Sequence, residues 1–177
     1  ARVHYDGAYE NSLHFSETFR RHAAALAAGL ARRHRLAGGR AVEVGCGDGG
    51  FLVELAAAAG CECVGFDPAH DPGRAALPAG IPVRIHSRPF SLEAAGRADL
   101  LCCRHVLEHL EDPVAFLEAL GPCRGPDGAL YCEVPDSLPA LRGEAVWDLI
   151  YEHPLYFTAP ALLRLLERAG ITAIRME

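Results

Sequence analysis

Glycines and one carboxylate form the first group of residues whose spacing points to chemistry. Gly45, Gly47 and Gly50 satisfy the pattern GxGxxG, and Asp67 follows about 20 residues later. Such glycines let a backbone turn approach a ligand, the following helix offers its N-terminal amides to negative charge, and an acidic residue at this distance accepts from ribose hydroxyls. The pattern predicts a nucleotide-type cofactor, but alone it does not separate NAD from other cofactors that contain a ribose.

A second group is His105, Glu108 and His109, which spell the HxxEH pattern of some zinc enzymes. Two histidines four residues apart on a helix share a face and could bind a metal together. A helix long enough for this is not expected, because Asp112 and Pro113 begin a new helix directly afterwards. The chain is also too short for the further ligand-bearing domain that zinc peptidases with this motif use. We therefore expect no metal site.

A Glu-His pair lies in the segment 136–157, which is unusually long for a connection in a compact domain. An imidazole with an unperturbed pKa of about 6.5 can take a proton near neutral pH, which makes His153 a candidate general base that Glu152 would orient. The candidate donors to a developing oxyanion are Tyr5, Tyr9, Tyr151 and Tyr156. Alternatively, Glu152 and His153 could simply end a helix over 144–151, with the imidazole near its last carbonyls.

Alternating strands and helices must position these groups. Apolar runs with strand character precede the glycine turn, Asp67 and His105, and segments of helical periodicity separate them. We predict strands over 41–44, 61–66, 81–86, 98–103, 128–134 and 171–176. We predict helices over 16–37, 51–59, 113–120 and 158–169.

This alternation implies βαβ units with right-handed crossovers. The expected fold is α/β, a Rossmann-like, doubly wound and mostly parallel sheet covered on both faces. Ligands bind such sheets beyond the carboxyl ends of the strands, which would gather the glycine turn, Asp67 and the residues after Cys103 and Val134 around one cleft. One domain over 1–177 is expected. Its parts are an N-terminal cap and helix (1–37), a cofactor-binding core (40–135), an active-site insertion (136–157), and a last helix and strand (158–177).

Composition argues against several classes of function. The chain has 17 basic and 23 acidic residues and a net charge of −6, so we expect no nucleic-acid partner. No apolar run is long enough to cross a membrane and no signal peptide is recognised, so a cytoplasmic protein without membrane contact is expected. The seven cysteines contain no CxxC and lie mostly in apolar runs, which indicates reduced thiols. The sequence does not predict an oligomeric state.

Three stretches together carry a resemblance to one family. The glycine turn also reads ExGxGxG, with Glu43 as the acidic residue, and resembles motif I of the class I S-adenosylmethionine-dependent methyltransferases. DLLCCRHVLEHLEDP is similar to the fourth-strand motif of that family, and GALYCEVPD is similar to its fifth. The resemblance extends from about Arg40 to Glu177 and implies a class I methyltransferase fold with S-adenosylmethionine as cofactor. It also implies a seventh strand, for which the sequence has no segment.

The resemblance assigns roles to individual residues. Glu43 would help to hold the methionine end of the cofactor, which Gly45 and Gly47 would allow the backbone to approach. Asp67 would accept from both ribose hydroxyls, and His105 would line the cleft near the sulfonium or the carboxylate. The remaining cofactor-binding candidates are Cys46, Pro68 and Phe90, of which Phe90 could lie at the adenine edge or pack in the core.

The run YEHPLYFT resembles the YHEHxxYFS motif of sugar C-methyltransferases that act on nucleotide-linked keto-deoxysugars, with one residue of that motif absent. DGAYENSLHFSETF is similar to the segment that follows a small zinc-binding domain in those enzymes, and the sequence contains no such cysteine-rich domain. The resemblance implies methyl transfer to a carbon beside a ketone in a small molecule, with His153, Glu152 and Tyr151 as catalytic residues. The alternatives are a small-molecule O-methyltransferase, an NAD-dependent oxidoreductase and a non-catalytic cofactor-binding module.

Overall fold

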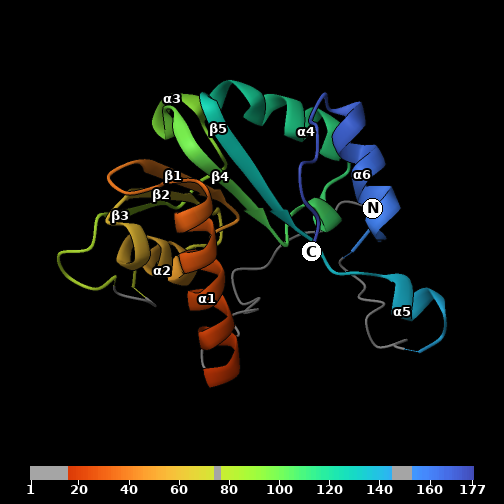
Figure 1. Ribbon diagram of the computed structural model, residues 1–177, viewed down its shortest axis with the longest axis horizontal. Coiled ribbons are helices and arrows are strands. Elements are labelled where there is room, and N and C mark those ends of the chain that lie inside the picture. Colours follow the sequence, from red (N-terminus) through yellow and green to blue (C-terminus); the bar gives the residue numbers. More distant parts are fainter. Residues whose placement is uncertain (1–15, 74–76, 145–152) are drawn as a thin grey trace. The chain divides into compact units, whose positions relative to one another are not determined.

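A computed structural model describes residues 16–73, 77–144 and 153–177, which contain a five-stranded sheet of order β3-β2-β1-β4-β5 (Figure 1). The strands are β1 (Arg40–Val44), β2 (Glu62–Phe66), β3 (Val83–His86), β4 (Ala98–Arg104) and β5 (Arg124–Glu133). β1 pairs in parallel with β2 and β4, and β2 pairs in parallel with β3. Because later strands add on both sides of β1, its carboxyl end lies at the switch point where open α/β sheets bind ligands.

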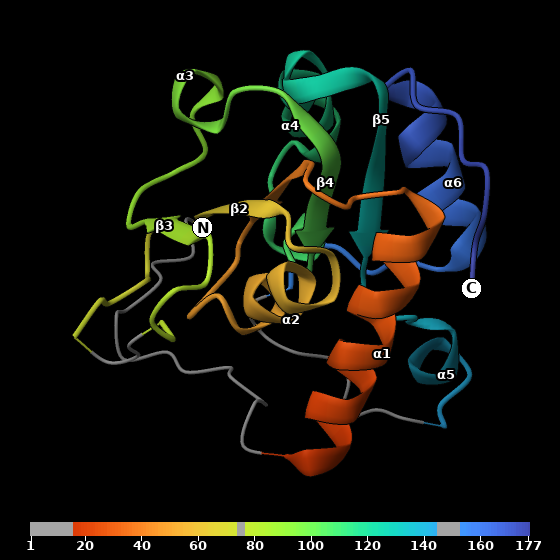
Figure 2. The ribbon, with the colours of Figure 1, turned by 60° about the vertical axis from the view of Figure 1, so that its left-hand side comes forward.

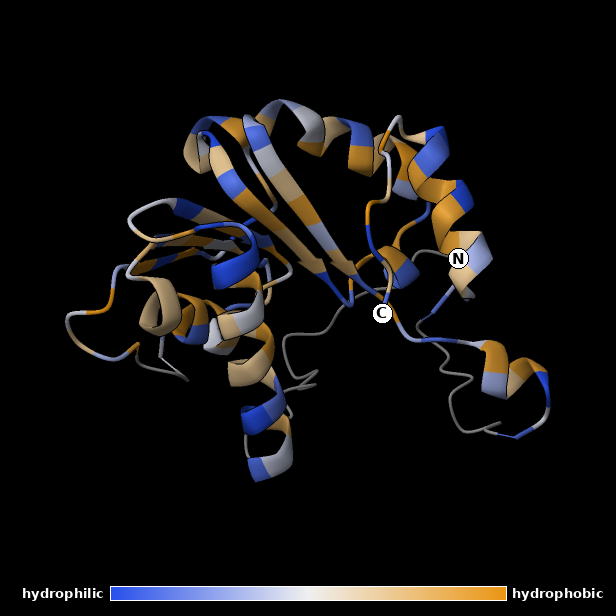
Figure 3. Ribbon diagram, in the orientation of Figure 1, coloured by the Kyte–Doolittle hydropathy of each residue, from blue (hydrophilic) through white to orange (hydrophobic). Residues whose placement is uncertain are grey.

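Burial explains why these runs form strands. In β4 the four consecutive residues Leu100–Cys103 are all buried, and β1 and β2 are buried along most of their length. Figure 3 shows the apolar character of these strands. Continuous burial, without alternation, is typical of parallel strands that are covered on both faces.

Two helices pack together in the part of the chain that holds most of the sheet (Figure 2). They are α1 (Glu17–Arg33) and α2 (Gly50–Ala59), and α2 also contacts β2. Ser16 caps α1 as predicted, since its Oγ accepts from the backbone N–H of Phe19 at 3.4 Å. Gly60 ends α2 with φ 60°, a left-handed conformation that favours glycine.

The chain divides into two compact units. The first comprises the residues up to Cys103 and Cys123–Tyr131, and it also contains the short helix α3 (Leu92–Ala95). The second comprises Arg104–Pro122 and the residues from Cys132 onward. Its helices are η1 (Leu107–His109), α4 (Pro113–Leu120), α5 (Leu138–Leu141) and α6 (Ala159–Arg168), while the turn η2 (Gly121–Cys123) joins the units in sequence.

In the second unit α4 packs against α6; α4 is mostly apolar, and α6 carries charged residues among its leucines (Figure 3). The Asp112 carboxylate caps α4 by accepting from the backbone N–H of Ala115 at 3.0 Å, as the Asp-Pro pair predicted. No helix among the described residues combines the length and the apolar character needed to cross a bilayer.

The predicted strand over 171–176 is wrong. Residues 171–177 are not in a strand, and Ile174 is 85% exposed. The backbone N–H groups of Gly170 and Ile171 instead donate to Glu167 and Leu166, at 3.0 and 2.8 Å, and close the end of α6. An apolar run becomes a strand only where a neighbouring strand satisfies its backbone groups, and the described residues provide none here.

Candidate functional site

The turn that follows β1 has the backbone geometry that the glycine spacing predicted. Gly45, Gly47 and Gly49 have φ values of 73°, 54° and 77°. A side chain at Gly47 would be strained in this left-handed region, although the space around its Cα is open. The backbone N–H of Gly45 donates to the carbonyl of Phe66 at 2.8 Å, which ties the turn to the end of β2.

Asp67 follows β2 and contacts the glycine turn directly. Its Oδ2 accepts from the backbone N–H of Gly47 and its Oδ1 from the backbone N–H of Ala69, both at 2.8 Å. A carboxylate oxygen can accept two hydrogen bonds, so both oxygens retain capacity for a ligand hydroxyl. The structure therefore brings together the two groups that the sequence had linked only by spacing; Pro68 follows as an exposed neighbour.

His70 is a functional candidate that the sequence analysis missed. Its buried side chain donates from Nδ1 to the carbonyl of Gly47 at 3.1 Å, and the same nitrogen lies 3.7 Å from Oδ1 of Asp48. Asp67 thus holds the backbone N–H of Gly47, and His70 holds its carbonyl. No motif marks an isolated histidine in a turn, so only the three-dimensional contact identifies it.

Glu43 lies in β1, and Cys46 is a residue of the turn that follows it. Glu43 is 2% exposed in β1, opposite Gly65 in β2 and Cys102 in β4. Burial, followed by the negative charges of Glu43 and Asp67, raises the pKa of the Cys46 thiol. Cys46 is therefore a neutral packing residue, because a reactive cysteine needs a lowered pKa. Its Sγ fills the space where Gly65 has no Cβ.

Phe90 belongs to an aromatic group near the ends of β2 and β3. Its ring meets Phe66 edge to face with the centroids 5.4 Å apart, and Phe66 stacks on His86 at 4.9 Å. Phe90 is half-buried, so this packing leaves part of the ring accessible. Its role at the adenine edge stays a prediction.

In the second unit, His105 forms an ion network directly after β4. Its Nδ1 lies 3.5 Å from Oε1 of Glu108 and its Nε2 lies 3.3 Å from Oε1 of Glu133, while Arg104 Nε donates to Oε2 of Glu133 at 2.7 Å. Hydrogen bonds to Glu108 and then Glu133 raise the pKa of His105 to about 9. Burial opposes ionisation of Glu133, but the bonds from His105 and Arg104 lower its pKa to about 2.

His105 is consequently a cation at neutral pH and not a proton acceptor. Its backbone has φ 52°, an uncommon conformation for a residue with a side chain, and its N–H donates to the carbonyl of Glu133 at 2.9 Å. Such outliers cluster at functional sites. Neither Glu133 nor Arg104 was singled out from the sequence, because the contact joins segments that are far apart in the chain.

The helical HxxEH arrangement is not formed. β4 ends at Arg104, and the 3-10 helix η1 contains only Leu107–His109, so His105 and His109 do not share a helix face. This agrees with the expectation that no long helix follows His105.

His153 lies in a group of polar side chains within the second unit. Its ring meets that of His109 edge to face at 4.6 Å, and Tyr156 lies 6.3 Å away, measured between ring centroids. A cavity of about 10 Å³ is lined by Glu108, Pro135, Asp136, Ser137, His153, Leu155, Tyr156 and Phe157. Glu152, Tyr151, Tyr5 and Tyr9 lie outside the described residues, as do residues 145–151 of the alternative helix over 144–151.

Comparison with known proteins found a matching family and several similar proteins. A family model described as "Methyltransferase domain" matches residues 16–175. A ubiquinone biosynthesis O-methyltransferase from Xanthomonas euvesicatoria pv. vesicatoria is 33% identical over 124 residues, which cover 66% of this chain and 52% of the relative. The chain thus spans about half the length of that relative.

Solved structures share the fold. The magnesium protoporphyrin IX methyltransferase from Synechocystis with bound SAH matches with a TM-score of 0.65 and 19% identity, covering 90% of this chain and 76% of that one. A methyltransferase of calicheamicin biosynthesis, also with SAH bound, has a TM-score of 0.64 and 22% identity, covering 91% and 52%. These matches confirm the predicted α/β, Rossmann-like fold.

Proposed function

Because the chain belongs to the family of methyltransferase domains, we propose that it transfers a methyl group from S-adenosylmethionine to a carbon beside a ketone in a sugar-like small molecule. The observation that carries the proposal is the contact between Asp67 and Gly47, which brings a carboxylate to the turn after β1. The glycine pattern alone left NAD and S-adenosylmethionine open, and the family favours S-adenosylmethionine.

The first unit supplies groups that suit the nucleoside part of the cofactor. Asp67 can accept from the ribose hydroxyls while it keeps its bond to Gly47. The open, left-handed backbone at Gly47 allows the methionine portion to approach the chain closely. Phe90 offers the edge of an accessible aromatic ring for adenine.

The charge of His105 selects which part of the cofactor it would bind. A protonated imidazole repels the positive sulfonium and attracts the carboxylate of the methionine portion. Of the two placements that the family resemblance implied, this charge favours the carboxylate. The Glu133 carboxylate keeps the imidazole protonated and oriented.

The transfer itself is an in-line displacement that depends mainly on placement. At a carbon acceptor, a base removes the proton beside the ketone, and the resulting enolate carbon donates its electron pair to the methyl carbon. As that C–C bond formed, the C–S bond of the cofactor would break, its electron pair would stay on sulfur, and S-adenosylhomocysteine would be the leaving group. His153 is our candidate for the base, because it is half-buried next to a cavity and an imidazole accepts protons near neutral pH.

Methyl transfer to oxygen is the second candidate function. It is favoured by the relative named as an O-methyltransferase, and it would use His153 to take the proton of a hydroxyl group. The two candidates share the cofactor and the base and differ only in the acceptor.

Ligand-dependent thermal unfolding tests the cofactor. At a concentration about 100-fold above Kd, S-adenosylhomocysteine should raise the midpoint by roughly 5 °C or more, and NAD should have no effect. Stabilisation by NAD alone would overturn the assignment.

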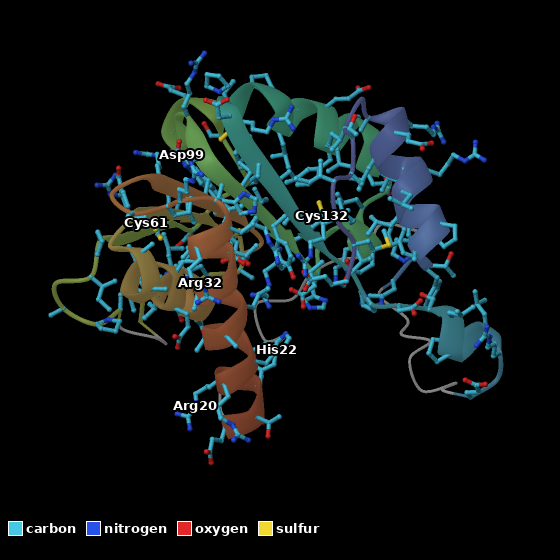
Figure 4. All side chains as sticks on the ribbon, viewed as in Figure 1. Arg20, His22, Arg32, Cys61, Asp99 and Cys132 are labelled. Carbon is cyan, nitrogen blue, oxygen red and sulfur yellow. The ribbon has the colours of Figure 1, made fainter. Side chains whose placement is uncertain are left out.

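Methyl transfer with labelled S-adenosylmethionine tests the base and the acceptor. A nucleotide-linked keto-sugar and a catechol are offered in parallel, and the position of the label separates carbon from oxygen. His153→Ala should lower kcat by about 10²–10⁴-fold, the usual contribution of general base catalysis. His22→Ala, which removes an exposed histidine of α1 (Figure 4), is the matched control and should leave kcat unchanged. Undiminished activity of His153→Ala would remove His153 from the mechanism.

A further inference from the structure

Glu108, His109 and His153 form a cluster of possible metal ligands in the second unit. Each offers one ligand atom, and the three atoms lie within 4.8 Å of one another. From this geometry we propose that the three side chains bind one divalent cation of the Zn²⁺ type. The set differs from the HxxEH motif, because His153 comes from a distant segment and takes the place of His105.

The buried carboxylate of Glu108 is the strongest indication that a cation binds here. Glu108 is 2% exposed, and its Oε2 has no hydrogen-bond partner among the described residues. A buried carboxylate oxygen without a partner is costly, so native structures rarely retain one. Oε1 faces His105 at 3.5 Å, which leaves Oε2 for the cation.

The backbone holds the three ligands in one place. Glu108 and His109 are adjacent in η1, and the backbone N–H of Leu155 donates to the carbonyl of Glu108 at 3.2 Å. This bond ties the segment that carries His153 to η1. The rings of His109 and His153 are already in contact, with 4.6 Å between centroids.

The donor set and the distances fit zinc better than a hard cation. Two imidazoles and one carboxylate are ligands that Zn²⁺ and its neighbours prefer, whereas Mg²⁺ and Ca²⁺ prefer oxygen alone. Ligand atoms around a tetrahedral Zn²⁺ are about 3.3 Å apart, given bond lengths near 2.0 Å. Side-chain rotations that close the present separation of at most 4.8 Å by about 1.5 Å would complete the site.

One coordination position remains for a small ligand. Glu108 and His153 both line the cavity of about 10 Å³, which has room for one water-sized occupant. Three protein ligands with an open position are typical of zinc sites that exchange a ligand, whereas structural sites use four. His105, held by Glu133 and Glu108, would orient the carboxylate from outside.

The site shares His153 with the proposed function, but its geometry is argued without the methyl transfer. A ring nitrogen that binds a cation cannot also accept a proton, so the cation and the base role of His153 exclude each other. Under the proposed mechanism, added Zn²⁺ therefore slows transfer, and a chelator restores it.

Cobalt titration of the chelator-treated protein tests the site without any acceptor. Co²⁺ should bind at one equivalent and give visible d–d absorption without thiolate charge-transfer bands, and Zn²⁺ should displace it. His153→Ala and His109→Ala should each weaken Co²⁺ binding by more than about tenfold. Loss of a residue that only supports a ligand already costs about that much, and loss of a ligand itself should cost more. His22→Ala should bind as the parent protein does.

Three results would overturn the proposal: no stoichiometric binding, equal binding by His153→Ala, or thiolate charge-transfer bands that reveal a cysteine site. Metal binding is also measured for Glu108→Gln. Because this change alters a buried residue, far-ultraviolet circular dichroism checks that the variant is folded. Stabilisation by S-adenosylhomocysteine reports the cofactor site separately. Absence of metal binding by the parent protein therefore contradicts the metal site alone, and absence of stabilisation by S-adenosylhomocysteine contradicts the proposed function alone.

Discussion

The Asp67 carboxylate accepts a hydrogen bond from the backbone N–H of Gly47 at 2.8 Å, so the ends of β1 and β2 are joined through a charged group. Parallel pairing aligns these two strands, with Val44 opposite Phe66, and the residues that follow them therefore meet at one edge of the sheet. A cofactor ribose and a left-handed glycine turn share this carboxylate in the proposed complex.

Asp67→Ala should weaken S-adenosylhomocysteine binding. Loss of charge-assisted hydrogen bonds of about 1.5–3 kcal/mol predicts a Kd roughly 10- to 150-fold higher by calorimetry. Asp71→Ala is the matched control, since Asp71 is exposed and its Oδ1 accepts from the backbone N–H of Gly73 in a similar turn. Equal effects of the two changes would show that Asp67 only stabilises its loop.

Gly65→Ala should destabilise the first unit. An added Cβ would lie 2.5 Å from Sγ of Cys46 and 2.8 Å from Cδ1 of Leu52, and overpacking of this kind costs about 1–3 kcal/mol. Gly29→Ala in α1 meets nothing within 4 Å and should instead stabilise by about 0.5–1 kcal/mol. Urea unfolding measures both, and a neutral Gly65→Ala would contradict the tight contact with Cys46.

Arg35→Gly should stabilise the protein. Arg35 follows α1 with φ 53°, and the backbone N–H of Leu36 donates to the carbonyl of Ala31 at 3.0 Å, which is the helix ending that favours glycine at this position. Relief of the left-handed conformation is expected to contribute roughly 1 kcal/mol to the free energy of unfolding. Arg32→Gly, within the helix, should have the opposite sign.

The network of Arg104, His105 and Glu133 predicts a pH dependence of stability. The pKa of Glu133 is lowered to about 2, so its contribution is present above the usual carboxyl range and is lost as pH falls toward that value. The pKa of His105 is raised from 6.5 to about 9, so its contribution is complete below 6.5 and is lost as pH rises through 9.

Glu133→Gln should therefore reduce the free energy of unfolding near pH 6 by on the order of 1 kcal/mol after solvent screening. It should also weaken the decrease of this free energy at acid pH and at alkaline pH. Glu118→Gln, on the exposed side of α4, is the control. Urea unfolding between pH 3 and 10 provides the measurement, and an unchanged alkaline limb would contradict the ion pair with His105.

Local signals made the sheet core and the cofactor turn predictable. Gly45, Gly47 and Asp67 are separated by a single helix and strand, so their meeting follows from the βαβ pattern and the parallel pairing. Ser16, Asp112 and Gly170 mark helix ends through interactions with backbone only a few residues away. These features depend on short stretches of chain, which is why the sequence alone identified them.

Contacts between distant segments were not predictable in the same way. His70 lies against Gly47, Glu133 against His105, and His153 against His109, and none of these pairs has a characteristic spacing. Residues 171–176 show the opposite case. Their composition is typical of a strand, but no strand forms, because no neighbouring strand lies beside them among the described residues. Strand pairing and side-chain contacts between distant segments depend on the whole folded chain, so the sequence of one segment does not predict them.

The clamp of His70 and Asp67 on Gly47 has a thermodynamic consequence. A glycine-rich turn normally loses much conformational entropy when a ligand orders it. Here two side chains hold the turn in a preorganised shape, so that cost is met during folding and not during binding. The cofactor would therefore retain more of its contact energy as affinity than it would on a turn of the same sequence without the buried imidazole.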